Sequence, residues 1–187
     1  MVARANSKSS RRTRDMVAAA LVTALMAATG WVAIPLGAVP ITLQTLGVAL
    51  AALLLPAGWA AASLALYVAL GAIGVPVFAG GRAGLGVVAG PIGGYLVGFI
   101  VAAGVAAFVR VATHQAKAPQ VVADVIAGIV LLAIVYVIGT GWLAYSLHLS
   151  LAKAVLAGVV PFVVGDAAKV AVAIGLAAAV RKAGVRL

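Results

Sequence analysis

Asp166 and Lys169 are the residues whose types and spacing could most readily do chemistry. They lie in the segment PFVVGDAAK, inside an apolar stretch near the end of the chain. Residues three apart on a helix face the same side, so this carboxylate and ammonium can meet. Either charge alone near the middle of a bilayer costs at least about 2.5 kcal/mol, whereas a pair neutralises itself. The pair either offers acceptors and donors to a small polar ligand or is a structural ion pair that fixes the last helix.

A glycine-rich stretch from residue 74 to residue 99 is the second candidate. It holds nine glycines in 26 residues, which helix packing alone does not explain, because glycine inside a helix costs about 1 kcal/mol relative to alanine. A close approach of the backbone to a ligand does explain them. Arg82 is the cation of this stretch and either holds a carboxylate or anchors the chain at the interface. Tyr95 either presents its phenol to a cavity or belongs to an interfacial aromatic belt.

Polar side chains also begin a short apolar segment, PITLQTL. Thr42, Gln44 and Thr45 place hydroxyls and an amide where a ligand or another helix must satisfy them. Trp31 and Phe78 either stack on an apolar ring or are packing residues.

The composition shows which elements must position these residues. Of the 187 residues, 66% are hydrophobic and 9% are charged, whereas an ordinary soluble domain has about 25% charged residues. A span of about 20 apolar residues crosses the roughly 30 Å hydrocarbon core. The chain is therefore long enough for five or six crossings. We expect an all-α integral membrane bundle rather than a water-soluble domain.

Proline and glycine divide the apolar sequence into six expected transmembrane helices. These cover residues 16–34, 42–55, 59–73, 87–109, 121–138 and about 161–182. Loops are expected at 35–41, 74–86, 110–120 and 139–150, and a short helix capped by Ser150 is expected at 150–159. The domain organisation is then a basic cytoplasmic tail (1–15), a membrane domain (16–182) and a C-terminal tail (183–187).

The distribution of positive charge predicts the orientation. If both termini are cytoplasmic, ten of the 13 Lys and Arg residues lie on the cytoplasmic side, Arg186 among them, and only Arg82 and Lys153 lie in outer loops. The glycine-rich loops are then external, over a ligand pocket. Because the basic residues flank membrane spans, nucleic-acid binding is not expected.

The sequence lacks the residues that several kinds of chemistry require. The sequence has no cysteine and no phosphate-binding G-x-x-x-x-G-K-[ST] loop, and His114 and His148 are far apart without acidic neighbours. We therefore expect no metal site, no cofactor and no ATP hydrolysis by this chain. An intramembrane enzyme with Asp166 as general base remains an alternative, but it lacks a nucleophile or metal partner.

Three separated segments resemble the BioY family, the biotin-specific S components of energy-coupling factor (ECF) vitamin transporters. They are PITLQTLGVALAALLL, LALYVALGAIGVPVFAGGRAGLGVVAGPIGGYLVGF and VVPFVVGDAAKVAVA. The resemblance extends over about residues 16–181. It implies a six-helix protein of the bacterial cell membrane that binds biotin from outside and is not an enzyme. It also implies a transmembrane T component and two cytoplasmic ATPase subunits as partners, which alone would use ATP. The alternative is an S component for another small vitamin, such as a thiamine-like or riboflavin-like molecule.

The resemblance also assigns residues. Asp166 and Lys169 match the family's GD-x-x-K signature, so Asp166 is expected to accept from the ureido N–H groups of biotin and Lys169 to donate to the ureido carbonyl. Arg82 and Tyr95 are the candidates for the valerate carboxylate. The remaining biotin-binding candidates are Gln44, Thr42, Phe78 and Trp31.

Small residues on the first helix supply a candidate docking surface. Ala20, Ala24 and Ala28 recur every four residues and form a smooth face that lets another helix approach. Ala20 and Ala24 match best the small-residue motif with which S components dock on the T component. Ile92 is a departure from the family, which often has threonine at this position, so a polar role there is not expected.

Overall fold

The computed structural model describes residues 2–184, and side chains from residue 11 onward. Arg186 and the rest of the tail at 185–187 lie outside the described residues. The helices are α1 (Val2–Trp31), α2 (Gln44–Leu54), α3 (Ala57–Ala72), α4 (Leu85–Ala89), α5 (Gly93–Gln115), α6 (Gln120–Ser146), α7 (Leu151–Gly158) and α8 (Val163–Lys182). A 3₁₀ turn, η1, covers Ala79–Gly81, and β1 (Ala33–Ile34) pairs antiparallel with β2 (Ile41–Thr42).

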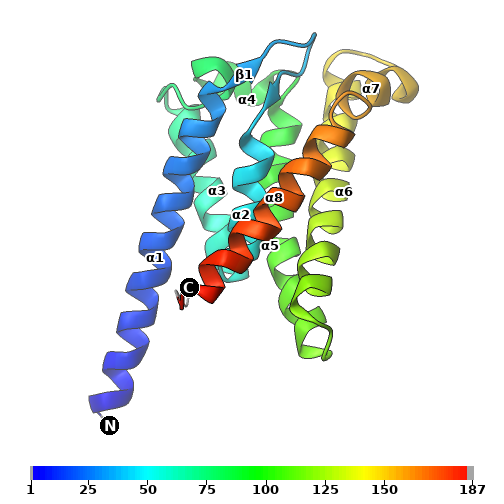
Figure 1. Cartoon of the computed structure of the whole chain (residues 1–187). Coiled ribbons are helices and arrows are strands. Elements are labelled where there is room, and N and C mark those ends of the chain that lie inside the picture. Colours follow the sequence, from blue (N-terminus) through cyan, green and yellow to red (C-terminus); the bar gives the residue numbers. More distant parts are fainter. Residues whose placement is uncertain (1, 185–187) are drawn as a thin grey trace.

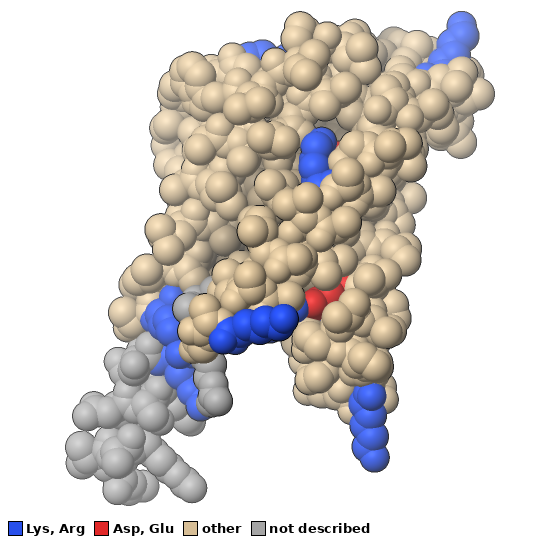
Figure 2. All heavy atoms as spheres, viewed as in Figure 1, with Lys and Arg blue, Asp and Glu red and all other residues tan. Residues whose placement is uncertain are grey.

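The long helices run side by side as a bundle (Figure 1). The first residues of α1, the last turn of α8 and the turn between α5 and α6 lie toward the lower end in this view, whereas β1, α4 and α7 lie at the upper end. Figure 2 shows Lys and Arg side chains mainly near the two ends and uncharged side chains over most of the middle. This distribution is typical of a protein that exposes its middle to lipid.

Among the described residues, three helices are long and apolar enough to cross a membrane: α5, α6 and α8. Helices α2 and α3 are apolar but shorter. The fold is therefore a mostly helical membrane fold, as the composition predicts.

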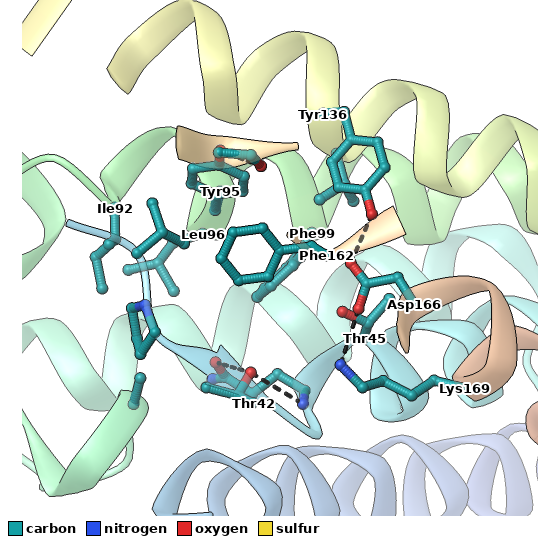
Figure 3. Close-up of a pocket in the computed structure, with 16 residues that line it drawn as sticks. Thr42, Thr45, Ile92, Tyr95, Leu96, Phe99, Tyr136, Phe162, Asp166 and Lys169 are labelled. Atoms are coloured by element: carbon teal, nitrogen blue, oxygen red, sulfur yellow. Dashed lines mark hydrogen bonds and ion pairs between the residues drawn. The ribbon is translucent and has the colours of Figure 1, made fainter. Parts of the chain in front are cut away.

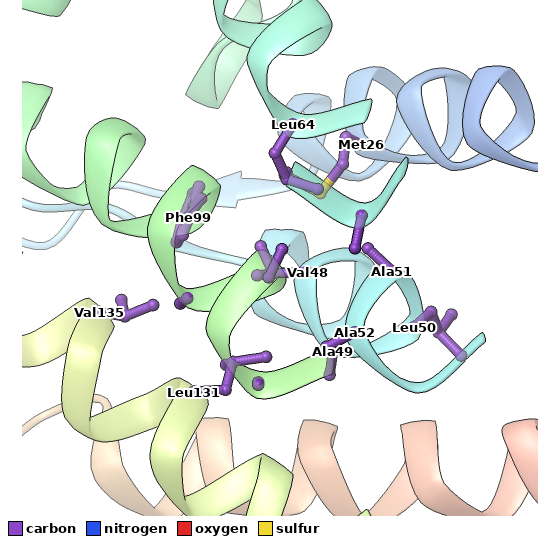
Figure 4. Packing of buried hydrophobic residues seen from close by; sticks show 14 of the residues in the cluster. Met26, Val48, Ala49, Leu50, Ala51, Ala52, Leu64, Phe99, Leu131 and Val135 are labelled. Carbon is purple, nitrogen blue, oxygen red and sulfur yellow. The ribbon is translucent and has the colours of Figure 1, made fainter. Parts of the chain in front are cut away.

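Helix α2 lies at the centre of the hydrophobic core (Figure 4). Its residues Val48, Ala51 and Ala52 are at most 1% exposed, and they are packed with fully buried side chains such as Met26 of α1 and Leu64 of α3. Small side chains on α2 and α5 let these helices lie close together. The core thereby fixes the start of α2, which carries the polar residues of PITLQTL.

The expected helix at 87–109 is wrong at its start. The chain forms the short helix α4, breaks at residues 90–92, and begins α5 at Gly93. Pro91 lacks an N–H donor and its ring clashes with the preceding turn, which disfavours a continuous helix here. The glycines that follow serve close packing, because a Cβ on Gly94 would overlap the side chain of Trp142 on α6.

Two expected loops are mostly helical. The segment 139–146 continues α6, and a Cβ on Gly139 would overlap the ring of Tyr95. Glycine here permits contact between helices rather than a turn. The segment 110–115 continues α5, which leaves only 116–119 as the connection. The short helix near 150 is confirmed, with the Ser150 side chain accepting a hydrogen bond from the backbone N–H of Lys153 at 3.5 Å.

Candidate functional site

A cavity lies among the start of α2, the segment at 39–42, and helices α5, α6 and α8 (Figure 3). It is partly open to the surface. Ile92, Leu96, Phe99 and Phe162 give it an apolar wall. Its lining suits a small ligand with an apolar body.

Asp166 and Lys169 face this cavity. The Lys169 Nζ atom lies 2.9 Å from Asp166 Oδ1 and donates a hydrogen bond to it. Asp166 lies in the first turn of α8, where the positive end of the helix dipole stabilises a carboxylate. Asp166 is 5% exposed, so the pair is held away from bulk solvent. The i, i+3 contact expected from the spacing is present.

Tyr136 of α6 completes this group. Its hydroxyl donates to Asp166 Oδ2 at 2.8 Å, so both carboxylate oxygens accept a hydrogen bond (Figure 3). We call Tyr136, Asp166 and Lys169 the upper cluster. The sequence analysis missed Tyr136. A hydroxyl in the middle of an otherwise apolar span was the available signal, because such a group needs a partner.

Thr42, Gln44 and Thr45 all line the cavity, at the start of α2. The Thr42 hydroxyl donates to Gln44 Oε1 at 3.1 Å. The Gln44 amide donates to the Tyr67 hydroxyl, which in turn donates to the Val77 carbonyl at 3.1 Å. This chain of hydrogen bonds fixes the polar start of α2 beside the cavity.

Tyr95 lines the cavity, but its hydroxyl is bonded within the protein. It donates to the Gly158 carbonyl at 2.8 Å and lies 3.3 Å from Thr140 Oγ1. A Cβ on Gly158 would overlap this hydroxyl, so the end of α7 packs directly on Tyr95.

The structure does not place the other three predicted site residues on the wall of this cavity. Phe78 is fully buried and packs its ring edge to face on Tyr67, with 5.6 Å between ring centroids. Trp31 is 61% exposed and lies beside Gly81. Arg82 lines a neighbouring cavity, and its Nε atom donates to the Ala79 carbonyl at 3.1 Å. The two cavities share Pro40 and Ala79, so they adjoin.

A second ion pair, which the sequence analysis also missed, joins a buried aspartate near the start of α6 to a partly exposed arginine near the end of α8. Asp124 is fully buried and accepts from the Arg181 guanidinium and, at 2.9 Å, from Gln120 Nε2. Arg181 also donates to the Leu53 carbonyl at 3.4 Å. We call Gln120, Asp124 and Arg181 the lower cluster. It faces none of the cavities described above.

Comparison with known proteins gives a consistent result. The model of the BioY family matches residues 3–186. The biotin transporter BioY of Thermotoga maritima is 39% identical over 169 residues, which cover 90% of this chain and 96% of that protein. The biotin transporter BioY of Rhizobium etli is 40% identical over 178 residues, which cover 90% and 93%. These relatives are named as transporters and not as enzymes.

A solved structure, described as the S-component for biotin from an ECF-type ABC transporter, has a similar fold. Its TM-score is 0.85 at 25% sequence identity, over 92% of this chain and 93% of that one. The bundle therefore has the fold of an S component.

Proposed function

Because the chain belongs to the BioY family, we propose that it is the biotin-binding S component of an ECF-type uptake transporter and captures biotin from the external side. The relatives are named biotin transporters, and the solved structure of similar fold is an S component for biotin. The observation that carries the proposal is the Asp166–Lys169 pair on the wall of the cavity.

The chemistry of this pair matches the ureido ring of biotin. A cyclic urea presents an N–H donor beside a C=O acceptor on one edge. Asp166 supplies an acceptor and Lys169 a donor, with 2.9 Å between the two atoms that face each other. An ammonium group has three donors, and the described structure uses one of those of Lys169, so the amine can also reach the ligand carbonyl.

The rest of the ligand fits the remaining surfaces. The apolar wall of Leu96, Phe99 and Phe162 suits the thiophane ring. The valerate chain passes Pro40 and Ala79 into the adjoining cavity, where the Arg82 guanidinium receives the carboxylate. Ile92 lines the main cavity with a purely apolar side chain, which supports an apolar contact there.

The proposed orientation has six membrane crossings, namely α1, α2, α3, α5, α6 and α8, and both termini in the cytoplasm of a bacterial cell. The lower end of the bundle in Figure 1 then faces inward, and the cavity, α4 and α7 face outward. The excess of basic residues at the ends of the chain supports this orientation. In this orientation the membrane domain covers residues 16–182, and the segments 1–15 and 183–187 are the cytoplasmic tails.

The proposed partners are a T component and two ATPase subunits, which use ATP while this chain needs no cofactor. Ala20 and Ala24 are exposed on α1, and their small side chains leave a face on which another helix can pack closely. This exposure supports the docking role that the family resemblance implies.

Equilibrium dialysis of the detergent-purified protein with labelled biotin tests the proposal. We expect saturable binding that unlabelled biotin abolishes and that excess thiamine or riboflavin leaves unchanged. Competition by one of those vitamins at lower concentration than biotin would assign the chain to another ligand. Absence of saturable biotin binding by folded protein would remove the proposed function.

A further inference from the structure

Tyr136 is a polar side chain that faces the cavity and has no part in the function proposed above. It lies midway along α6 and is partly buried. Its hydroxyl donates to Asp166 Oδ2 at 2.8 Å, and its ring forms part of the cavity wall (Figure 3). A hydrogen bond to an ionised acceptor is stronger than one between neutral groups.

The contact with Lys169 alone does not fix Asp166 relative to the cavity. Both residues belong to α8 and are three positions apart, so they move together when the helix moves. The hydrogen bond from Tyr136 crosses from α6 to α8. Within residues 2–184, it is the hydrogen bond that ties the Asp166 carboxylate to another helix.

The two contacts together determine how the carboxylate is turned. Lys169 bonds Oδ1 and Tyr136 bonds Oδ2, so rotation of the carboxylate about its Cβ–Cγ bond would break one contact or both. Each oxygen keeps a further lone pair for a ligand N–H donor. A group held in this way loses little conformational entropy when the ligand binds.

We propose that Tyr136 is a positioning residue for biotin binding, which acts through Asp166 by holding its carboxylate in the orientation that accepts a ureido N–H group. This inference rests on the function proposed above. It predicts that Tyr136 matters only while Asp166 has a carboxylate to hold, whereas a residue that merely shapes the cavity would matter in either case.

A double-mutant cycle separates the two roles. Biotin Kd is measured for the wild type, Tyr136→Phe, Asp166→Ala and the double variant, with thermal unfolding as a check on folding. Tyr136→Phe keeps the ring and removes one hydrogen bond to a charged group, so we expect its Kd to rise about tenfold. In the Asp166→Ala background, the same change should alter Kd by less than about twofold. Tyr145→Phe is the matched control, since Tyr145 lies on the same helix and is 74% exposed.

Each outcome is decisive. If the fold-increase in Kd of the double variant equals the product of the increases of the two single variants, Tyr136 only shapes the cavity. That result would overturn the inference. The inference would also be overturned if Tyr136→Phe bound biotin with the same Kd as the wild type. Failure of the wild type to bind biotin would instead remove the function proposed above, so the two failures are distinguishable.

A ligand analogue keeps the inference testable if Asp166→Ala does not fold. Biotin methylated on both ureido nitrogens has no N–H donor for Asp166. Tyr136→Phe should therefore weaken biotin about tenfold and change the Kd of this analogue by less than about twofold. An equal loss for both ligands would contradict positioning through Asp166.

Discussion

The upper and lower clusters are built from the same two helices and differ in what surrounds them. Each places a buried aspartate between α6 and α8, Asp166 at 5% exposure and Asp124 at 0%. Each aspartate has a cationic partner and a neutral donor on its two oxygens. By burial and pairing alone, the two would be equivalent candidates for a binding site.

The difference lies in the surroundings of the cation. Lys169 of the upper cluster lines a cavity. Arg181 of the lower cluster donates to Asp124 and to the Leu53 carbonyl near the end of α2. The lower cluster therefore ties α2, α6 and α8 together, whereas the upper cluster presents polar groups to open space. Of the two clusters, the upper one can offer its polar groups to a ligand, because a cavity adjoins it.

The largest effect is expected from breaking the lower cluster. Asp124→Ala leaves the Arg181 guanidinium without its carboxylate partner. Because this guanidinium is partly exposed, we expect a cost of at most about 3 kcal/mol, the lower end of the range for a fully buried pair. We expect a strongly lowered Tm in detergent, while folded protein binds biotin with Kd within about threefold of the wild type.

Asp15→Ala is the matched control, because Asp15 is only partly buried on α1. If Asp124→Ala left the Tm unchanged and abolished biotin binding, the lower cluster would serve binding rather than stability, contrary to the assignment made here.

A smaller effect is expected from disturbing the wall of the upper cavity. In Gly158→Ala, the added methyl group would overlap the Tyr95 hydroxyl and displace its ring. Overpacking of this kind costs about 1–3 kcal/mol, and we expect biotin Kd to rise about tenfold in a titration.

Gly165→Ala is the control, since a Cβ at Gly165 would meet no atom within 4 Å. Equal Kd values for both variants would mean that the Tyr95 wall does not contact the ligand.

The smallest effect is expected at Arg82, which is exposed at the adjoining cavity. An exposed ion pair contributes at most about 1 kcal/mol, so Arg82→Gln should raise biotin Kd by about fivefold or less. Biotin methyl ester, which lacks the carboxylate charge, should bind both proteins equally in competition assays. If Arg82→Gln weakened binding of the methyl ester as much as binding of biotin, Arg82 would not be the residue that binds the carboxylate.

The sequence predicted the parts of the site that depend on neighbours along the chain. Asp166 and Lys169 are three positions apart, so helical geometry alone brings them together. Tyr136 is 30 residues from Asp166, and Asp124 is 57 residues from Arg181. No local pattern encodes these two contacts, because they depend on how α6 packs on α8.

Glycine was the less reliable signal for the fold. Gly139 and Gly141 suggested a loop, but α6 continues through them. The Tyr95 ring occupies the space that a side chain at Gly139 would need, so glycine there permits a close contact between helices. At Pro91 the expected helix at 87–109 was also wrong, although the missing N–H donor was a local signal for the break. Backbone chemistry is therefore readable from sequence, whereas the closeness of another helix is not.

The role of the Asp166–Lys169 pair is tested most directly by calorimetric titration of biotin into Asp166→Asn, Lys169→Ala and the wild type. The thermal transition of each protein shows that it is folded. If the pair on α8 holds the ureido ring, each variant should bind at least about a hundredfold more weakly, a loss of about 2.7 kcal/mol. Folded variants that bind biotin as tightly as the wild type would contradict the assignment of this cavity as the biotin site.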